Sequence, residues 1–292
     1  MEARPPLRSI RLVSPVAAPV PALAAEFPSV RITFVDGAEG DGAGAPVVDE
    51  EAWLEAASFR PFDEAIEAAR SDALVVRGHE VGSVACEVLT RFQRFVDRRN
   101  DASRGPVFDA VLAAHRALHD TSKPLVKADL DHALDAWQWL LRLSPDAGLA
   151  VQLAALFHDV ERLESEPDAR VEQHAPDYQA FKDAHARRGG DVAYDVLVGC
   201  GVDRKTAVRA RAIIATHERR GIDPDVDLLN DADALSFFSL NSPGYADYFG
   251  PAQTRKKVAY TLGRLGPSAR ARLAGVRLRS DVRVRLEEVM AA

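Results

Sequence analysis

Cysteine is scarce in this chain, with only Cys86 and Cys200 among 292 residues. This excludes the small proteins that are held together by a disulfide framework. Neither cysteine has a metal-binding partner at short spacing, so we expect two buried, reduced thiols.

Long apolar runs are also missing. No stretch of 18 apolar residues occurs, so the sequence predicts no membrane span. Residues 12–25 have a faint likeness to a signal peptide, but Pro15, Pro19 and Pro21 interrupt its apolar part. We therefore expect a cytoplasmic protein.

The chain has no overall excess of positive charge, since its formal net charge is −7. This gives no reason to expect nucleic acid as a partner. The charge is uneven, however. Residues 251–292 contain ten Lys/Arg and three Asp/Glu, a local charge of +7. Such a basic segment suits either solvated helix faces or contacts with a phosphate.

The first part of the chain alternates between two patterns. Runs rich in valine and isoleucine at 7–14, 30–35 and 73–77 predict strands, and helical patterns at 50–57 and 62–70 lie between them. We therefore predict a small α/β region of unknown role over residues 1–83. The glycine-rich stretch 37–45 predicts a loop that does not bind phosphate, because no Lys-Ser/Thr follows the glycines.

From residue 84 onward the apolar residues recur at helical spacing. The predicted helices cover 84–96, 107–118, 127–143, 148–163, 177–198, 204–218, 228–239, 251–265 and 279–289. Strand signals are nearly absent there. We predict a mainly α protein, in which an all-α bundle over residues 84–292 follows the α/β region.

Metal-ligating residue types recur along this helical part. The candidates are His132, His158, Asp159, His185, His217 and Asp233. Imidazole and carboxylate groups both bind divalent metals, and a carboxylate can bridge two of them. A helix bundle can direct such side chains into a dry, shaped interior.

Other histidines suit a metal less well. His115 and His119 have the i,i+4 spacing of a metal pair, but they precede a polar break and no general base accompanies them. We interpret them as structural or solvent-facing. His79 and His174 lie in loop-like stretches and receive the same interpretation.

The order of these residues and their local sequences resemble the HD superfamily of metal-dependent phosphohydrolases. Residues 131–136, Asp-His-Ala-Leu-Asp-Ala, are similar to the family's first histidine segment. Residues 154–162 are similar to its central His-Asp motif, and 232–235 to its closing Ala-Asp-x-Leu segment. The extension over 241–257 looks like an uncharacterised bacterial subgroup. The resemblance covers roughly 125–245 and not the N-terminal region.

The resemblance implies a function and a ligand set. It assigns His132, His158, Asp159 and Asp233 to one metal, and members with histidines like His185 and His217 hold two metals that the Asp159 carboxylate would bridge. The metal would be Mn, Fe, Ni, Co or Zn. The implied reaction is hydrolysis of a phosphate ester or anhydride by a metal-bound hydroxide, on a nucleotide or another small phosphorylated molecule.

The residues after the motif depart from several known branches. Members that cleave guanosine alarmones carry two acidic residues where this chain has Arg162 and Leu163. Nucleotidase-type members have Glu at the position of Arg162, and several dinuclear members have Lys. Glu218 follows His217 where cyclic-dinucleotide phosphodiesterases show a second histidine. We predict that Arg162 stabilises charge, because an arginine is a poor proton donor.

Basic residues near the ligands are weaker candidates for substrate phosphate. These are Lys182, Arg255, Lys256 and Lys257. Asp231 competes with Asp233 as the last ligand. A helix places these two on separate faces, so only one can serve, and the local motif favours Asp233.

Two other functions remain open. One is a non-catalytic HD-like binding module, and the other is a di-iron HD-type oxygenase. The complete ligand series argues against the first. The sequence does not identify the substrate, the native metal or the oligomeric state.

Overall fold

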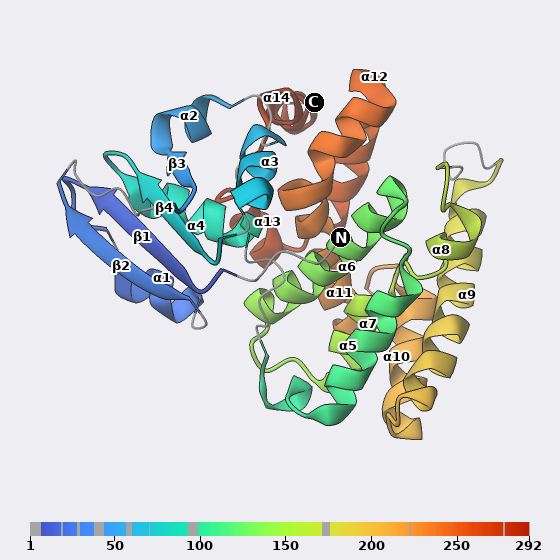
Figure 1. Ribbon diagram of the computed structural model, residues 1–292. Coiled ribbons are helices and arrows are strands. Elements are labelled where there is room, and N and C mark those ends of the chain that lie inside the picture. The colour runs from blue at the N-terminus through green and yellow to red at the C-terminus, as the bar shows by residue number, and fades with distance from the viewer. Residues whose placement is uncertain are drawn as a thin grey trace. The chain divides into compact units, whose positions relative to one another are not determined.

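The computed structural model describes residues 7–18, 20–27, 30–37, 44–56, 60–69, 71–92, 99–170, 176–221, 223–276 and 278–291. The chain forms two compact units: one holds Met1–Arg98 with Arg277–Arg283, and the other Arg99–Val276 with Val284–Ala292. The protein is mainly α-helical with an α/β segment at its N-terminus, as the sequence predicts (Figure 1). The first unit extends to residue 98, however, and does not end at the predicted residue 83.

The N-terminal unit is a parallel sheet with helical connections. The strands β1 (Ser9–Ser14), β2 (Arg31–Asp36), β3 (Val47–Asp49) and β4 (Ala73–Arg77) lie in the order β2-β1-β4-β3. The helices are α1 (Val20–Glu26), α2 (Glu50–Glu55), α3 (Arg60–Ala69) and α4 (Val81–Phe92). Parallel neighbours require such crossovers. The short strand β3 was not predicted from the sequence.

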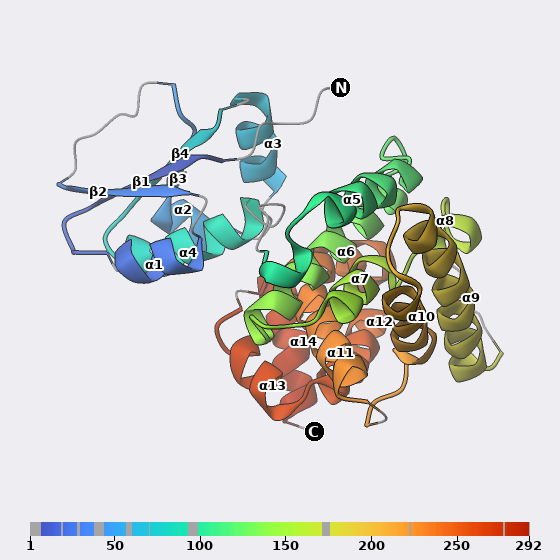
Figure 2. The ribbon, with the colours of Figure 1, turned by 90° about the horizontal axis from the view of Figure 1, so that it is seen from below.

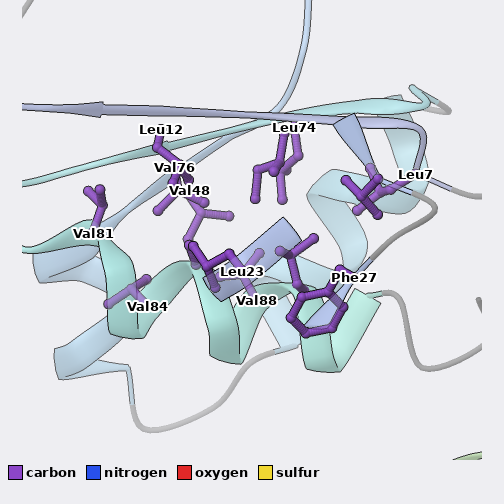
Figure 3. Close-up of a cluster of buried hydrophobic side chains, with 14 of the residues drawn as sticks. Leu7, Leu12, Leu23, Phe27, Val48, Leu74, Val76, Val81, Val84 and Val88 are labelled. Carbon is purple, nitrogen blue, oxygen red and sulfur yellow. The ribbon is translucent and has the colours of Figure 1, made fainter. Parts of the chain in front are cut away.

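One face of this sheet forms the core of the unit. Leu12 and Val76 are paired across β1 and β4, and both point toward α1 and α4 (Figure 3). Leu23 of α1 and Val88 of α4 meet them from the helical side. Because α4 completes this core, the predicted assignment of the helix at 84–96 to the bundle is wrong. Its amphipathic pattern shows that one face is buried, but not against which unit.

In its described residues the second unit consists of helices and the turns that connect them. It contains the 3₁₀ turn η1 (Asp101–Ser103), α5 (Pro106–Leu118), α6 (Pro124–Leu143), α7 (Leu149–Phe157), α8 (Arg162–Ser165), α9 (Tyr178–Gly199), α10 (Arg204–Thr216), α11 (Pro224–Ser236), the π-helical turn η3 (Phe237–Asn241), α12 (Ser242–Arg264) and α13 (Pro267–Leu273). The helix α14 (Ser280–Met290) has residues in both units.

The helix α7 is the centre of the bundle. Seven consecutive residues, 151–157, are buried, and a helix that is apolar all round belongs in a core. It contacts α6, α9, α10 and α11, and it lies beside α6 and α10 in Figure 2. The predicted helix over 148–163 is therefore interrupted: α7 ends at Phe157, a turn follows, and α8 begins at Arg162. His158 and Asp159 lie in this turn, at the end of the most buried helix.

The last predicted helices differ from the structure in one region. α11 continues through η3 directly into α12, so the segment before residue 251 is also helical. Within α12, Gly250 has a φ of 76° and breaks the regular path just before Pro251. A positive φ favours glycine, which explains why the helical pattern in the sequence resumes only after this point.

None of the described helices has both the length and the hydropathy that a membrane crossing requires. Both cysteines were expected to be buried. Cys200 is only half-buried, so the expectation is wrong for this residue, and the side chain of Cys86 lies outside the described part.

Candidate metal centre

The six residues expected to bind metal come from five helices of the second unit. His132 lies on α6, His185 on α9 and Asp233 on α11, and His217 immediately follows α10. His158 and Asp159 follow α7. The structure brings one ligand atom each from His132, His158 and Asp159 within 4.8 Å of one another.

Two carboxylates lie among the imidazoles. Oδ1 of Asp233 is 3.1 Å from Nε2 of His132 and 3.7 Å from Nε2 of His158. Oδ1 of Asp159 is 3.0 Å from Nε2 of His185, and its Oδ2 is 3.8 Å from Nε2 of His158. His158 is thus shared between the two carboxylates, and each carboxylate has a second histidine of its own.

His217 lies next to this cluster. Its ring centroid is 5.5 Å from that of His158 and 6.3 Å from that of His185. Its Nε2 is 3.3 Å from Oε1 of Glu218. All six predicted ligands are therefore neighbours, and Glu218 adds a third carboxylate on the His217 side.

The four imidazoles are oriented in the same way. Each Nδ1 lies 2.6–2.9 Å from an oxygen of the protein: Ser236 Oγ for His132, Ala155 O for His158, Glu161 Oε2 for His185 and Ile214 O for His217. Carbonyl and carboxylate oxygens only accept hydrogen bonds, so at least three of the Nδ1 atoms carry the hydrogen. In a neutral ring the lone pair then lies on Nε2, the atom that faces the carboxylates.

Nε2 of His158 is the most unusual atom of the site. It is buried, and among the described residues no group lies at hydrogen-bond distance and angle to it. Buried polar atoms are rarely left in this state, because desolvation without a partner costs free energy. Burial lowers the pKa of His158, but the carboxylates of Asp159 and Asp233 outweigh that effect and raise it to about 9. The position attracts a cation, which can be a proton or a metal.

Two arginines balance the carboxylates. Burial raises the pKa of Asp159, but Arg162, His158 and His185 outweigh this and hold it well below its ordinary value. The Asp233 carboxyl behaves in the same way, and Arg264 contributes most to lowering its pKa. Both aspartates are therefore ionised, as metal ligation requires.

Arg162 lies inside this network. Its Nε is 3.0 Å from Oδ2 of Asp159, and its Nη1 donates to Oε2 of Glu166 at 3.0 Å. Glu166 is buried and also lies 3.7 Å from Nη1 of Arg170. The guanidinium of Arg162 is thus held against the carboxylate that we expect to bridge two metals.

The choice between the two aspartates of α11 follows from their contacts. Asp231 accepts from Nη1 of Arg220 and from the backbone N–H of Gly266, both at 2.7 Å. Asp233 instead contacts two of the histidines and accepts from Nη1 of Arg264 at 2.7 Å. Asp231 faces away from the cluster, as the helical spacing of the two residues predicts.

Several site residues were not predicted. Glu161 accepts from Nδ1 of His185 at 2.6 Å, and it is itself held by Ser165 Oγ and Arg188 Nε, both at 2.8 Å. Arg264 joins Asp233 to Asn230, at 2.8 Å from its Nε to Oδ1. No sequence signal marks Arg264, which lies 31 residues after its partner Asp233. Glu161 follows the His-Asp pair closely, but one carboxylate in a charged turn is unspecific.

The four weaker phosphate candidates do not form one cluster. Lys182 is buried, and its Nζ is 2.6 Å from Oε1 of Glu218. Arg255 pairs with Glu288 at 3.6 Å, and Lys256 is exposed. Lys257 lies among aromatic rings of η3 and α12. The neighbours Arg255, Lys256 and Lys257 thus have three different surroundings.

The histidines set aside on sequence grounds lie outside the ligand cluster or outside the described residues. His115 and His119 are buried, at 1% and 7% exposure, and His115 packs on the ring of Phe157 at 4.8 Å. They are structural, and the alternative that they face solvent is wrong. His79 is exposed, and His174 lies outside the described residues.

Comparisons with known proteins supply a family but no activity. No curated protein and no solved structure matches the chain. The model of one family matches residues 107–285, more than half of the chain and nearly all of the helical unit. The chain belongs to this family, whose description is a domain of unknown function, DUF4202.

Proposed function

We propose that the protein is a metal-dependent hydrolase of phosphate esters or anhydrides. The observation that carries the proposal is the common orientation of four imidazoles. Each is anchored through Nδ1 and directs Nε2 toward a carboxylate: Asp233 for His132, Asp159 for His185, both of these for His158, and Glu218 for His217. Metal-ligating histidines are held in this way, by a hydrogen bond from the ring nitrogen that does not bind the metal.

A metal explains the cluster better than protons do. If protons alone filled the Nε2 positions, four imidazolium groups would be crowded together in the protein interior, at ring separations of 5.2–6.3 Å for the neighbouring pairs. One or two divalent ions satisfy the same nitrogen and oxygen atoms with less mutual repulsion. The mixed nitrogen and oxygen set suits Mn, Fe, Ni, Co or Zn more than Mg or Ca, which prefer oxygen.

The number of donor side chains is sufficient for two ions. His132, His158 and Asp233 lie on one side, and His185, His217 and Glu218 on the other. Asp159 lies between them, because one of its oxygens faces His158 and the other faces His185. We propose that Asp159 would offer one oxygen to each of two ions. When bound, the metals would supply an acidified water and neutralise phosphate charge.

The chain's own residues contribute charge and order. Arg162 holds Asp159 and offers a permanently charged guanidinium beside the reaction centre, which suits binding of the developing negative charge. Arg264 holds Asp233 in one rotamer through its Nη1. Lys182 supplies a second cation near His217, currently neutralised by Glu218. We further propose that the protein works in the cytoplasm on a small phosphorylated molecule.

The test compares two aspartates on one helix. We expect purified wild-type protein to contain a transition metal and to hydrolyse at least one member of a nucleotide and phosphodiester panel under Mn, Fe, Ni, Co or Zn loading. Asp233→Asn should lower metal content and reduce kcat/KM by about 100-fold or more. Asp231→Asn changes a carboxylate only two positions away and should retain both metal and activity.

Other outcomes would point elsewhere. Equal metal content and activity in the two variants would refute the ligand assignment. Bound metal without turnover of any phosphate ester would favour a non-catalytic HD-like binding module. A mixed-valence signal in electron paramagnetic resonance of iron-loaded protein, without phosphate release, would favour a di-iron oxygenase.

A further inference from the structure

One face of α12 leads away from the metal centre. Lys257, Tyr260 and Arg264 are spaced three and four residues apart, so they share this face. Arg264 follows Lys257 by seven positions, which is about 10 Å along a helix. Nη1 of Arg264 is bonded to Asp233, and its guanidinium carbon lies 5.7 Å from the centroid of the Tyr260 ring. The face therefore begins at a metal ligand and ends at Lys257.

Tyr260 connects the two ends. Its hydroxyl donates to Oε2 of Glu218 at 3.4 Å, and the other oxygen of Glu218 is 3.3 Å from Nε2 of His217. The ring of Tyr178 meets the ring of Tyr260 edge-on, with centroids 6.0 Å apart and planes at 89°. Both tyrosines are half-buried.

Lys257 is surrounded by aromatic rings. Its Nζ lies 5.7 Å from the centroids of Phe237 and Tyr260 and 6.0 Å from that of Tyr245. Phe237 is buried, whereas Tyr245 and Lys257 are half-buried. An ammonium group at this distance from ring faces is attracted to their electrons, which holds the lysine in place.

The chemistry of this group suits a planar ring better than a second phosphate. Aromatic side chains stack on any nucleobase, and a lysine donates to the carbonyl oxygens and ring nitrogens of a base. Arginine forks suit bidentate contacts with a phosphate, whereas the ammonium of Lys257 lies near three aromatic rings. The carboxylate of Glu218 beside Tyr260 also disfavours a further anion at that end.

We infer that Lys257, Tyr260, Tyr245 and Tyr178 form a subsite for the base of a nucleotide whose phosphate lies at the metal centre. The inference rests on the proposed function and narrows its substrate to a nucleoside phosphate. Of the phosphate candidates Arg255, Lys256 and Lys257, only Lys257 is then a substrate residue. Arg255 and Lys256 belong to the surface of the bundle.

The test measures binding of non-hydrolysable probes to cobalt-loaded protein by calorimetry. The probes are the phosphonate analogues of adenosine and guanosine monophosphate and of ribose 5-phosphate. Wild type should bind at least one nucleoside probe about tenfold more tightly than the ribose probe, since stacking alone is worth roughly five- to 150-fold. Lys257→Met and Tyr260→Leu should remove most of this difference and change affinity for the ribose probe by less than about threefold.

Three matched variants separate recognition from folding. Lys256→Met changes the exposed neighbour, and Tyr248→Leu removes an exposed ring of the same helix. Both should bind like wild type. Tyr260→Phe keeps the ring and loses only the hydroxyl, so it should retain the preference for the nucleoside probe.

Each contrary result has a distinct meaning. If Lys257→Met weakens all three probes equally, the group binds an anion and the inference fails. If wild type binds ribose and nucleoside probes equally yet hydrolyses phosphate esters, the base subsite fails and the proposed function stands. If wild type prefers the nucleoside probe but releases no phosphate from any nucleotide, the proposed function fails.

Discussion

The contact between Glu161 and His185 allows a sharp test of how the metal centre is supported. Oε2 of Glu161 accepts from Nδ1 of His185 at 2.6 Å and from Ser165 Oγ at 2.8 Å, and Oε1 accepts from Nε of Arg188 at 2.8 Å. Burial raises the pKa of Glu161, but His185 and Arg188 outweigh this and lower it to about 2. The carboxylate is therefore charged at every working pH, and its charge makes His185 a more basic ligand.

The substitution Glu161→Gln removes this charge with little change of shape. The glutamine oxygen can keep the bonds to His185 and Ser165, but the amide then meets Arg188 donor to donor. Arg188 is 53% exposed in its side chain and can turn into water. We expect a loss of only about 1 kcal/mol in the unfolding free energy of the metal-free protein. Metal affinity should fall by about 10- to 100-fold, as for other residues that orient a ligand.

A competition titration against a chromophoric chelator measures this affinity for Co²⁺ or Zn²⁺. Chemical unfolding in the presence of EDTA measures the structural cost separately. Glu164→Gln is the matched control, because Glu164 is exposed on α8 and close in sequence. Affinity of Glu161→Gln within about twofold of this control would refute the role of the carboxylate.

Two further predictions concern stability. The folded-state pKa of His158, about 9, lies above the ordinary value of about 6.5, so metal-free protein should lose up to about 3 kcal/mol of stability as pH rises from 6.5 to 9. Denaturant midpoints should fall over this pH range in the presence of EDTA and stay constant with bound Co²⁺. A rise of the midpoint with pH in EDTA would contradict the prediction. In Gly190→Ala, the new Cβ would lie 2.9 Å from the carbonyl oxygen of Arg211, whereas at Gly199 it would meet nothing within 4 Å. Gly190→Ala should therefore cost about 1–3 kcal/mol by pressing α9 away from α10, and equal stability of Gly190→Ala and Gly199→Ala would contradict it.

Much of the fold was predictable, because helical periodicity is a local signal. The helices at 107–118 and 204–218 depend on apolar spacing that no distant contact overrides. The wrong predictions concern segments whose structure depends on contacts with distant parts of the chain. The strand β3 has three residues, too few for a periodicity, and it exists because it pairs with β4. The helix at 148–163 has an unbroken pattern, yet the chain turns at His158.

That the six candidate ligands lie close together was predictable from the sequence, whereas the residues that support them were not. Histidines and aspartates within apolar helices are a recognisable sequence signal, because such residues are rarely buried there without a partner. The helical spacing of Asp231 and Asp233 also separated the two correctly. Arg264 and Ser236 carry no such signal, because their importance comes from contacts across the bundle that only the packing of α6, α11 and α12 creates.

The π-helical turn Phe237–Asn241 stands between the metal ligands and part of the base subsite. A π-helix holds more residues per turn than an α-helix, and such a turn typically contains one residue more than the regular path needs. Loss of that one residue would let α11 run into α12 as a plain α-helix and rotate the following residues by roughly 100° about the axis. Tyr245 and Lys257 both follow the turn in α12, so they would move together relative to Phe237, whereas His132, His158 and Asp233 do not follow it. A single-codon deletion would therefore shift the base subsite relative to the metal ligands, and it would also move Arg264, which holds Asp233.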